Sequence, residues 1–190
     1  MKIDMAIEKV RPHLTESRFQ HSLRVAETAV KLAGLYNVSP AKAEIAAVFH
    51  DYAKYRPLEE MKHWIVKSTL PKDLLLYHHE LWHGPVGALL IQAEHGIADR
   101  EIQEAIQYHT TGRANMSMLD KIIYLSDYIE PGRNFPGVDE VREMAGKDLT
   151  KACWMASRNT IDHLMRKQGT IYPDSFYAYN DLTNKLNGGT

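Results

Sequence analysis

The chain has 190 residues, of which 44% are hydrophobic and 25% are charged, and its formal net charge is −1. This length and composition are typical of one globular domain and exclude the disordered and fibrous classes. The balanced charge also argues against a general binder of nucleic acids or membrane surfaces, which would need a basic patch.

Start and stop signals divide the first half of the chain into four predicted helices. Thr15 is a predicted N-cap, and the apolar residues that follow it recur with a period of 3.6. Ser39 followed by Pro40 is typical of an N-cap and a first helical position. The predicted ranges are 15–36, 39–51, 57–66 and 72–78.

The second half is predicted to be helical as well, without the alternation that indicates strands. Gly96 and Pro131 end two of its helices, and Gly169 ends the longest. The predicted ranges are 84–96, 99–109, 117–130 and 139–167. Residues 170–190 are expected to form a short coil that packs back on the body. We therefore predict an all-α fold and a single domain over 1–190, with a core at about 15–135 that residues 139–190 complete.

Histidine and aspartate residues recur at the ends or inner faces of successive predicted helices. Taken alone, an inward histidine such as His21 is more often a hydrogen-bonded core residue, and an aspartate near a helix end is more often a cap. The ordered set is more specific than any member: His21, His50, Asp51, His83, His109 and Asp127. The other histidines are expected to be exposed or half-buried: His13, His63, His78, His79, His95 and His163.

The amino-acid sequence around these residues resembles that of a known family. A histidine, then a His-Asp pair, then a distant aspartate is similar to the signature of HD-domain metal-dependent phosphohydrolases. Over about residues 15–173 the chain resembles the YqeK-type subfamily, in the segments RFQHSLRVAETAVKLA, AAVFHDYAK, HGPVGALL, IQYHTTGRANMSMLDKIIYLSDYIEPGR and CWMASRNTIDHLMRKQGTIYP. The resemblance implies a helical HD-domain bundle. It also implies symmetrical hydrolysis of diadenosine tetraphosphate to two ADP with an iron-type metal.

On this resemblance, four residues hold one ion: His21, His50, Asp51 and Asp127. A mixed shell of nitrogen and oxygen suits Fe, Mn, Co, Ni or Zn better than Ca or Mg alone. Such an ion would lower the pKa of a bound water and polarise a phosphoryl group. His83 and His109 either hold a second ion or contact phosphates as donors and proton shuttles. We predict catalytic roles for Asp51, His83 and His109.

A polyphosphate substrate needs positive charge near the metal. Arg18 lies one helical turn before His21, and Lys54 lies one turn after the His-Asp pair. Arg133 lies in a loop rich in glycine and proline, where a guanidinium can bind phosphate or stack on a base. For each of these cations the ordinary alternative is a solvated surface charge. The predicted substrate contacts are Arg18, His21, Lys54, His83, His109, Arg133, Gly169, Thr170 and Tyr172.

Three other functions are compatible with parts of this pattern. The same site could act on mononucleotides, either nucleoside monophosphates or deoxynucleotides, and a groove with room for two nucleosides would argue against that. A nucleotide-binding adaptor without catalysis would have lost ligand residues, yet all six are present. A plain helical interaction module would leave their order unexplained.

We expect a cytoplasmic protein whose partner is the nucleotide substrate, with neither nucleic acid nor membrane as a partner. Cys153 is the single cysteine, which suits a reducing compartment. Residues 1–14 lack the apolar core of a signal peptide, and no apolar run approaches the roughly 18 residues of a membrane span. The exposed face of the predicted helix 139–167 offers a surface on which a homodimer can form.

Overall fold

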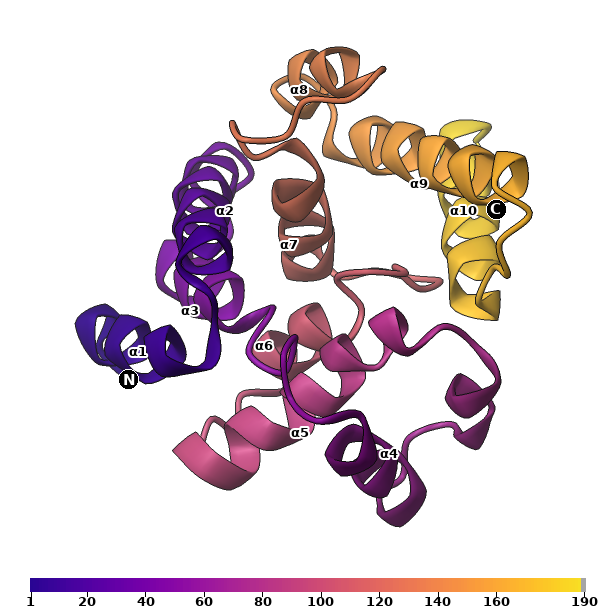
Figure 1. Ribbon diagram of the computed structural model, residues 1–190. Coiled ribbons are helices and arrows are strands. Elements are labelled where there is room, and N and C mark those ends of the chain that lie inside the picture. Colours follow the sequence, from indigo (N-terminus) through magenta and orange to yellow (C-terminus); the bar gives the residue numbers. More distant parts are fainter. Residues whose placement is uncertain (189–190) are drawn as a thin grey trace.

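The computed structural model describes residues 1–188, and within that range every regular element is helical (Figure 1). The α-helices are α1 (Ile3–Val10), α2 (Glu16–Leu35), α3 (Pro40–Phe49), α4 (Leu58–Lys67), α5 (His83–His95), α6 (Arg100–Gln107), α7 (Met118–Ile129), α8 (Val138–Ala145), α9 (Leu149–Arg166) and α10 (Pro173–Leu186). Short 3-10 segments are η1 (Arg11–His13), η2 (Lys72–Leu76) and η3 (His79–Leu81). The predicted all-α fold class is confirmed.

Four helices start where a capping side chain is found in the sequence. The Thr15 and Ser39 side chains accept a hydrogen bond from the backbone N–H three residues later, and Asp99 accepts from two backbone N–H groups. Ser117 forms a capping box with Asp120, in which each side chain accepts from the other residue's backbone N–H. Because these bonds pair donors that the first helical turn leaves free, single residues predict the helix starts well.

The stretch predicted as one helix over 139–167 is two helices. α8 ends at Ala145, and α9 begins after Asp148, whose side chain accepts a hydrogen bond from the backbone N–H of Lys151 at 2.9 Å. The prediction was wrong because this aspartate caps a new helix rather than continuing the old one. Gly146, which costs helix stability, lies at the break.

Two other segments differ from their predictions. Residues 72–78 form only the 3-10 segment η2, and a helix this short gains little from its own hydrogen bonds. Residues 170–190 were expected to be coil, but α10 occupies most of the described part. Pro173 is its first helical residue, where the missing N–H costs nothing. Ala178 is fully buried, and α10 packs against α9.

Helix α7 lies at the centre of the bundle (Figure 1). It contacts α2, α3, α6, α8 and α9, and its side chains Ile122, Ile123 and Leu125 are fully buried. α2 and α3 pack on one side of it, and α9 and α10 lie on the other. A polar residue on this helix is therefore held by neighbours from several elements.

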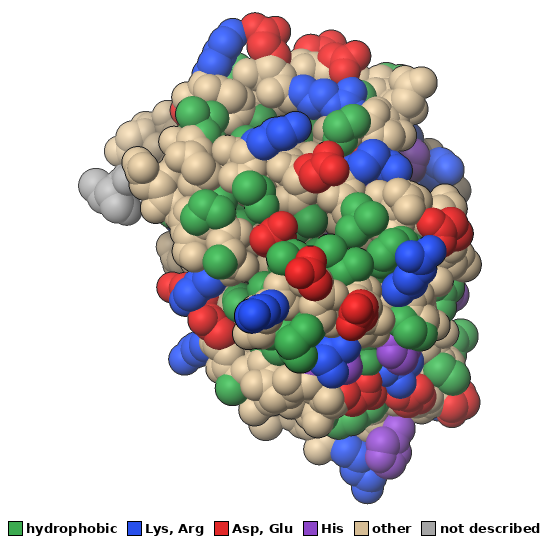
Figure 2. All heavy atoms as spheres, turned by 90° about the vertical axis from the view of Figure 1, so that its left-hand side faces the viewer, with side chains coloured by type: hydrophobic (Ala, Val, Ile, Leu, Met, Phe, Trp, Pro, Cys, Tyr) green, Lys and Arg blue, Asp and Glu red, His purple; other side chains and the backbone are tan. Residues whose placement is uncertain are grey.

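The face formed by α1, α2 and α3 carries acidic and basic side chains interspersed with hydrophobic ones (Figure 2). Neither sign of charge forms a continuous patch on this face. Among the described helices, none is long and apolar enough to cross a membrane.

Candidate metal centre

Six residues of the predicted set come together where five helices meet. His21 lies on α2, His83 begins α5, and Asp127 lies on α7. His50 and Asp51 follow the end of α3, which stops at Phe49, two residues earlier than predicted. His109 follows α6, which stops at Gln107. We call these six the metal cluster: His21, His50, Asp51, His83, His109 and Asp127. Five of them are at most 5% exposed, and the Asp127 side chain is 16% exposed.

Three of the histidines are oriented by the same local device. Each Nδ1 atom lies within hydrogen-bond distance of the backbone carbonyl three residues earlier. These distances are 2.6 Å for His50, 2.6 Å for His83 and 2.7 Å for His109. Because a carbonyl oxygen can only accept, each Nδ1 carries the hydrogen, and in the neutral ring Nε2 presents a lone pair.

His21 lies inside a helix, so the carbonyls before it are taken by helical hydrogen bonds. Its Nδ1 instead donates to Oε1 of Glu130 at 3.0 Å. Burial would raise the pKa of Glu130, but hydrogen bonds from Arg24, His21 and the Gly132 N–H lower it to about 2. Glu130 is therefore a carboxylate at neutral pH, and it only accepts.

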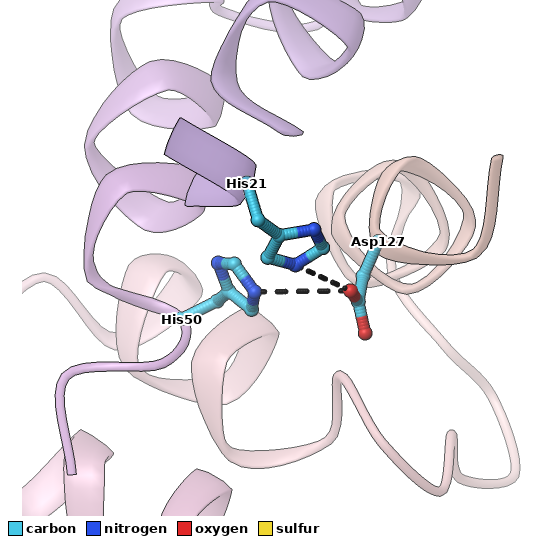
Figure 3. Close-up of side chains that lie close together, drawn as sticks. All are labelled: His21, His50 and Asp127. Carbon is cyan, nitrogen blue, oxygen red and sulfur yellow. Dashed lines mark ion pairs between the residues drawn. The ribbon is translucent and has the colours of Figure 1, made fainter. Parts of the chain in front are cut away.

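The Nε2 atoms of these histidines meet carboxylate oxygens. His21 Nε2 lies 3.0 Å from Asp127 Oδ1, and His50 Nε2 lies 3.9 Å from the same oxygen (Figure 3). His50 Nε2 also lies 2.9 Å from Asp51 Oδ2, and His83 Nε2 lies 3.1 Å from Asp51 Oδ1. Lone pairs of nitrogen and oxygen thus face one another in a buried space.

This arrangement fits a cation, because acceptors that face one another need a positive group between them. Both Asp51 oxygens and the Nε2 atoms of His21 and His50 are buried without a satisfactory hydrogen bond. Ligand atoms lie within 4.8 Å of one another in two overlapping sets, His21, His50, Asp127 and His50, Asp51, His109. Imidazole with carboxylate suits a first-row transition metal or zinc, as predicted.

The charges of the cluster follow from burial and from its neighbours. Burial would raise the pKa of Asp51, but His50 and His83 outweigh it and hold that pKa well below the usual range. The pKa of Asp127 is likewise held well below its usual range, against burial, by His21, His50 and Arg133. Both carboxyls are therefore ionised at neutral pH.

His109 is the opposite case. Burial, followed by the neighbouring His83 and His50, lowers its pKa to about 3. Its imidazole is therefore neutral at physiological pH, and its Nε2 lies 3.1 Å from His83 Nε2.

Two of the predicted phosphate contacts lie against the carboxylates of the cluster. Arg18 pairs through Nε with Asp51 Oδ2. The Nη2 atom of Arg133 lies 2.6 Å from Asp127 Oδ1, and its Nε donates to the Asp127 carbonyl at 2.9 Å. Positive charge is therefore present beside two carboxylates of the metal cluster.

The other predicted contacts lie further out. Lys54 pairs with Glu80, the residue whose carbonyl orients the first histidine of α5. Gly169 and Thr170 are exposed, whereas Tyr172 is buried and lies with its ring 5.0 Å from that of Tyr77. In the described chain, Gly169, Thr170 and Tyr172 form no hydrogen bond or ion pair with the metal cluster.

The pocket beside the metal cluster was not predicted from the sequence. It has a volume of about 260 Å³ and is lined by His109, Thr110, Tyr124, Asp127, Tyr128, Arg133, Phe135 and Thr160. The Thr110 hydroxyl is buried there and has no hydrogen-bond partner in the part of the chain that the structure describes. Tyr128 and Phe135 meet edge to face at the wall, with ring centroids 5.0 Å apart. The aromatic period on α7 was visible in the sequence, but it is equally typical of a core helix.

Comparisons with known proteins show which family this chain resembles. The HD domain family model matches residues 18–132. Relatives named "Bis(5'-nucleosyl)-tetraphosphatase, symmetrical" include one from Bacillus subtilis (strain 168), 49% identical over 97% of this chain and 99% of its own length. Another, from Halalkalibacterium halodurans, is 50% identical over 93% and 95% of the two chains.

A solved structure shares the whole fold. It is a crystal structure from Clostridium acetobutylicum described as a predicted HD superfamily hydrolase involved in NAD metabolism. The two chains are 41% identical, with a TM-score of 0.92 over 97% of this chain and 98% of that one. From the ordered His and Asp residues, their convergence in space and these similarities, it follows that this chain belongs to the HD domain family.

Proposed function

We propose that this chain is a metal-dependent phosphohydrolase that cleaves diadenosine tetraphosphate symmetrically into two molecules of ADP. The observation that carries the proposal is the convergence of buried imidazole nitrogens and two ionised carboxylates beside two arginines and a pocket. The shared name of the relatives supports the substrate, because their similarity spans nearly the whole chain.

Four residues would hold the ion, two through Nε2 and two through carboxylate oxygens: His21, His50, Asp51 and Asp127. When bound, the ion supplies an activated water as nucleophile and polarises the phosphoryl group. We propose iron, which the subfamily resemblance implies, and Mn, Co, Ni and Zn are compatible with the same donors. One ion held this way leaves His83 and His109 to act on the substrate.

His83 and His109 are proposed to deliver a proton to the departing ADP. Each Nδ1 already donates to a carbonyl, so a hydrogen between the two Nε2 atoms serves both rings. Because the low pKa of His109 leaves its Nε2 without a hydrogen, His83 is the proposed donor, and Asp51 Oδ1 lies 3.1 Å from its Nε2. The His83 Nε2–H can then pass its proton to the leaving phosphate oxygen.

Arg18 and Arg133 are proposed to bind the phosphate chain. Both guanidinium groups pair with ligand carboxylates, so both lie within one side-chain length of the phosphate that reacts. Their planar forks match phosphate oxygens better than an ammonium group does. Arg133 also lines the pocket, so it connects the reacting phosphate with the nucleoside.

The pocket beside Asp127 is proposed to hold one nucleoside of the substrate. Tyr128 and Phe135 offer aromatic surface on which a base can stack. The buried Thr110 hydroxyl has no partner among residues 1–188, and we propose that it hydrogen-bonds a ribose or base atom. We place the protein in the cytoplasm, where its nucleotide substrate is found and where a lone buried Cys153 stays reduced.

The test is to measure bound metal by elemental analysis and to incubate the loaded protein with diadenosine tetraphosphate. We expect ADP as the sole product in chromatography. ATP with AMP would contradict symmetrical cleavage. Turnover of nucleoside monophosphates or deoxynucleotides, with none of the dinucleotide, would favour the mononucleotide alternative.

A further inference from the structure

Glu130 is a buried carboxylate that no ligand role accounts for. It follows the last residue of α7, three positions after Asp127, and is 2% exposed. A carboxylate taken out of water is costly unless donors surround it. Glu130 lies at the end of α7, the helix that carries Asp127 of the metal cluster. This position suggests that the hydrogen bonds of Glu130 do more than stabilise the fold.

Every partner of Glu130 is a donor. Besides His21 at 3.0 Å, Arg24 donates from Nε to Oε2 at 2.6 Å, and the backbone N–H of Gly132 donates to Oε2 at 2.6 Å. His21 and Arg24 both lie on α2, whereas Glu130 and Gly132 directly follow α7. The carboxylate therefore joins the two elements that carry His21 and Asp127.

Among the four histidines of the metal cluster, His21 is the one whose ring is oriented by a residue from another element. The other three histidines of the metal cluster are each oriented by the backbone carbonyl three residues earlier, at a helix end or turn. His21 lies in the interior of α2. Its ring is instead held from another element, by Glu130.

We infer that Glu130, oriented by Arg24, is a positioning residue for His21. Its carboxylate keeps the hydrogen of His21 on Nδ1, aims the Nε2 lone pair at the metal cluster, and fixes the distance between α2 and α7. A carboxylate behind an imidazole also makes it a stronger metal ligand. The inference rests on the proposed function only in assuming that an ion is what Nε2 meets.

The experiment compares Glu130→Gln with Glu94→Gln in the full chain. Glu94 is a matched control because its carboxylate also binds an arginine, Arg56 at 2.6 Å, but among the described residues it forms no hydrogen bond or ion pair with the metal cluster. Two quantities are measured: the affinity of the metal-free protein for Mn²⁺ by calorimetry, and the tautomer of His21 by nitrogen-15 NMR. The His21 signal is assigned by its loss in His21→Gln.

We expect Glu130→Gln to keep its helical circular dichroism, to bind Mn²⁺ about 10- to 100-fold more weakly, and to populate both His21 tautomers. Glu94→Gln should match wild type in both measurements. Glu130→Asp, which keeps the charge on a shorter arm, should recover part of the affinity.

Three results would overturn the inference: an unchanged His21 tautomer in Glu130→Gln, unchanged Mn²⁺ affinity in that variant, or equal losses of affinity in both glutamine variants. The last would show a general loss of stability rather than positioning. If wild type itself bound no Mn²⁺, the proposed function would fail instead, while the NMR measurement would still test the link from Glu130 to His21.

Discussion

Two clusters of histidine and carboxylate side chains lie next to each other in the described part of this molecule. Asp51 belongs to one of them, and the next residue, Tyr52, belongs to the other. One is the metal cluster. The other, which we call the Tyr52 cluster, surrounds a phenol hydroxyl and consists of His13, Tyr52, Arg56, Glu94 and His95. In composition the two are alike, since each combines several imidazoles with at least one carboxylate and one nearby arginine.

The two clusters differ in where their hydrogens lie. In the Tyr52 cluster the hydroxyl donates to Glu94, and Arg56 Nη2 donates to the hydroxyl at 3.1 Å and to Glu94 at 2.6 Å. His13 Nε2 and His95 Nε2 lie 3.2 and 3.0 Å from the same hydroxyl oxygen. In the metal cluster, nitrogen and oxygen lone pairs face one another instead. In the Tyr52 cluster only His95 Nδ1 and Arg56 Nε are buried without a partner among the described residues, whereas several orphaned acceptors converge in the metal cluster. Their convergence, and not the number of histidines, marks the place for a cation.

The largest expected effect comes from a substitution in the metal cluster, at Asp51. Asp51→Asn removes a carboxylate that faces two histidines and Arg18. We expect bound metal to be lost and hydrolysis of diadenosine tetraphosphate to fall by more than about 100-fold, because a ligand costs more than its supporting partner. Helical circular dichroism should persist. Metal content and activity near those of wild type would refute the site.

The pocket gives the next largest effect. Tyr128→Ala removes a stacking surface worth about 1–3 kcal/mol, so KM should rise roughly 5- to 150-fold with little change in kcat. Tyr177→Ala is the matched control, since that ring is 58% exposed and belongs to α10. Steady-state kinetics of both variants decide the matter. An equal change in both, or a change confined to kcat, would place the nucleoside elsewhere.

Glu94→Gln tests the Tyr52 cluster, where we expect an effect on stability. Loss of its carboxylate should lower the free energy of unfolding by about 1 kcal/mol, because the Glu94 side chain is 34% exposed and its ion pair is partly screened. For a chain of this size that lowers Tm by about 2–4 °C. Calorimetric melting measures it. A loss of metal affinity in this variant would mean that the two clusters are coupled.

The smallest effect is a pH dependence in the Tyr52 cluster. Burial would raise the pKa of Glu94, but the Tyr52 hydroxyl and Arg56 hold it below the ordinary value of 4.5. A carboxyl whose pKa is lowered on folding adds stability above its unfolded pKa and loses it as the pH falls through the folded pKa. The stability gap between wild type and Glu94→Gln should therefore be constant near pH 7 and shrink below about pH 4.5. Denaturant unfolding of both proteins across this pH range measures the stability gap. A gap that widens in acid would contradict the expected direction.

Much of the fold was predictable from single residues. Capping side chains such as Thr15 and Ser117 act within one helical turn, so their effect can be seen in the sequence. The break at Asp148 was missed because the same residue type can sit on a helix surface, and only packing selects the capped start. The coil expected after residue 170 is a helix because α9 offers its buried face a partner.

The sequence by itself determined which chemical groups are available and in what order. His21, the His50–Asp51 pair and Asp127 could be singled out because ligand types at the ends or inner faces of successive helices form a linear pattern, and the resemblance extends that pattern to a family.

Only the tertiary structure decided what those groups meet. The link from Glu130 to His21 spans 109 positions, and the wall of the pocket joins α7 with α9. No periodicity records such pairs, because they depend on how helices pack rather than on how each helix forms. Packing likewise makes the histidines around Tyr52 hydrogen-bonded neighbours and those around Asp51 a place for a cation.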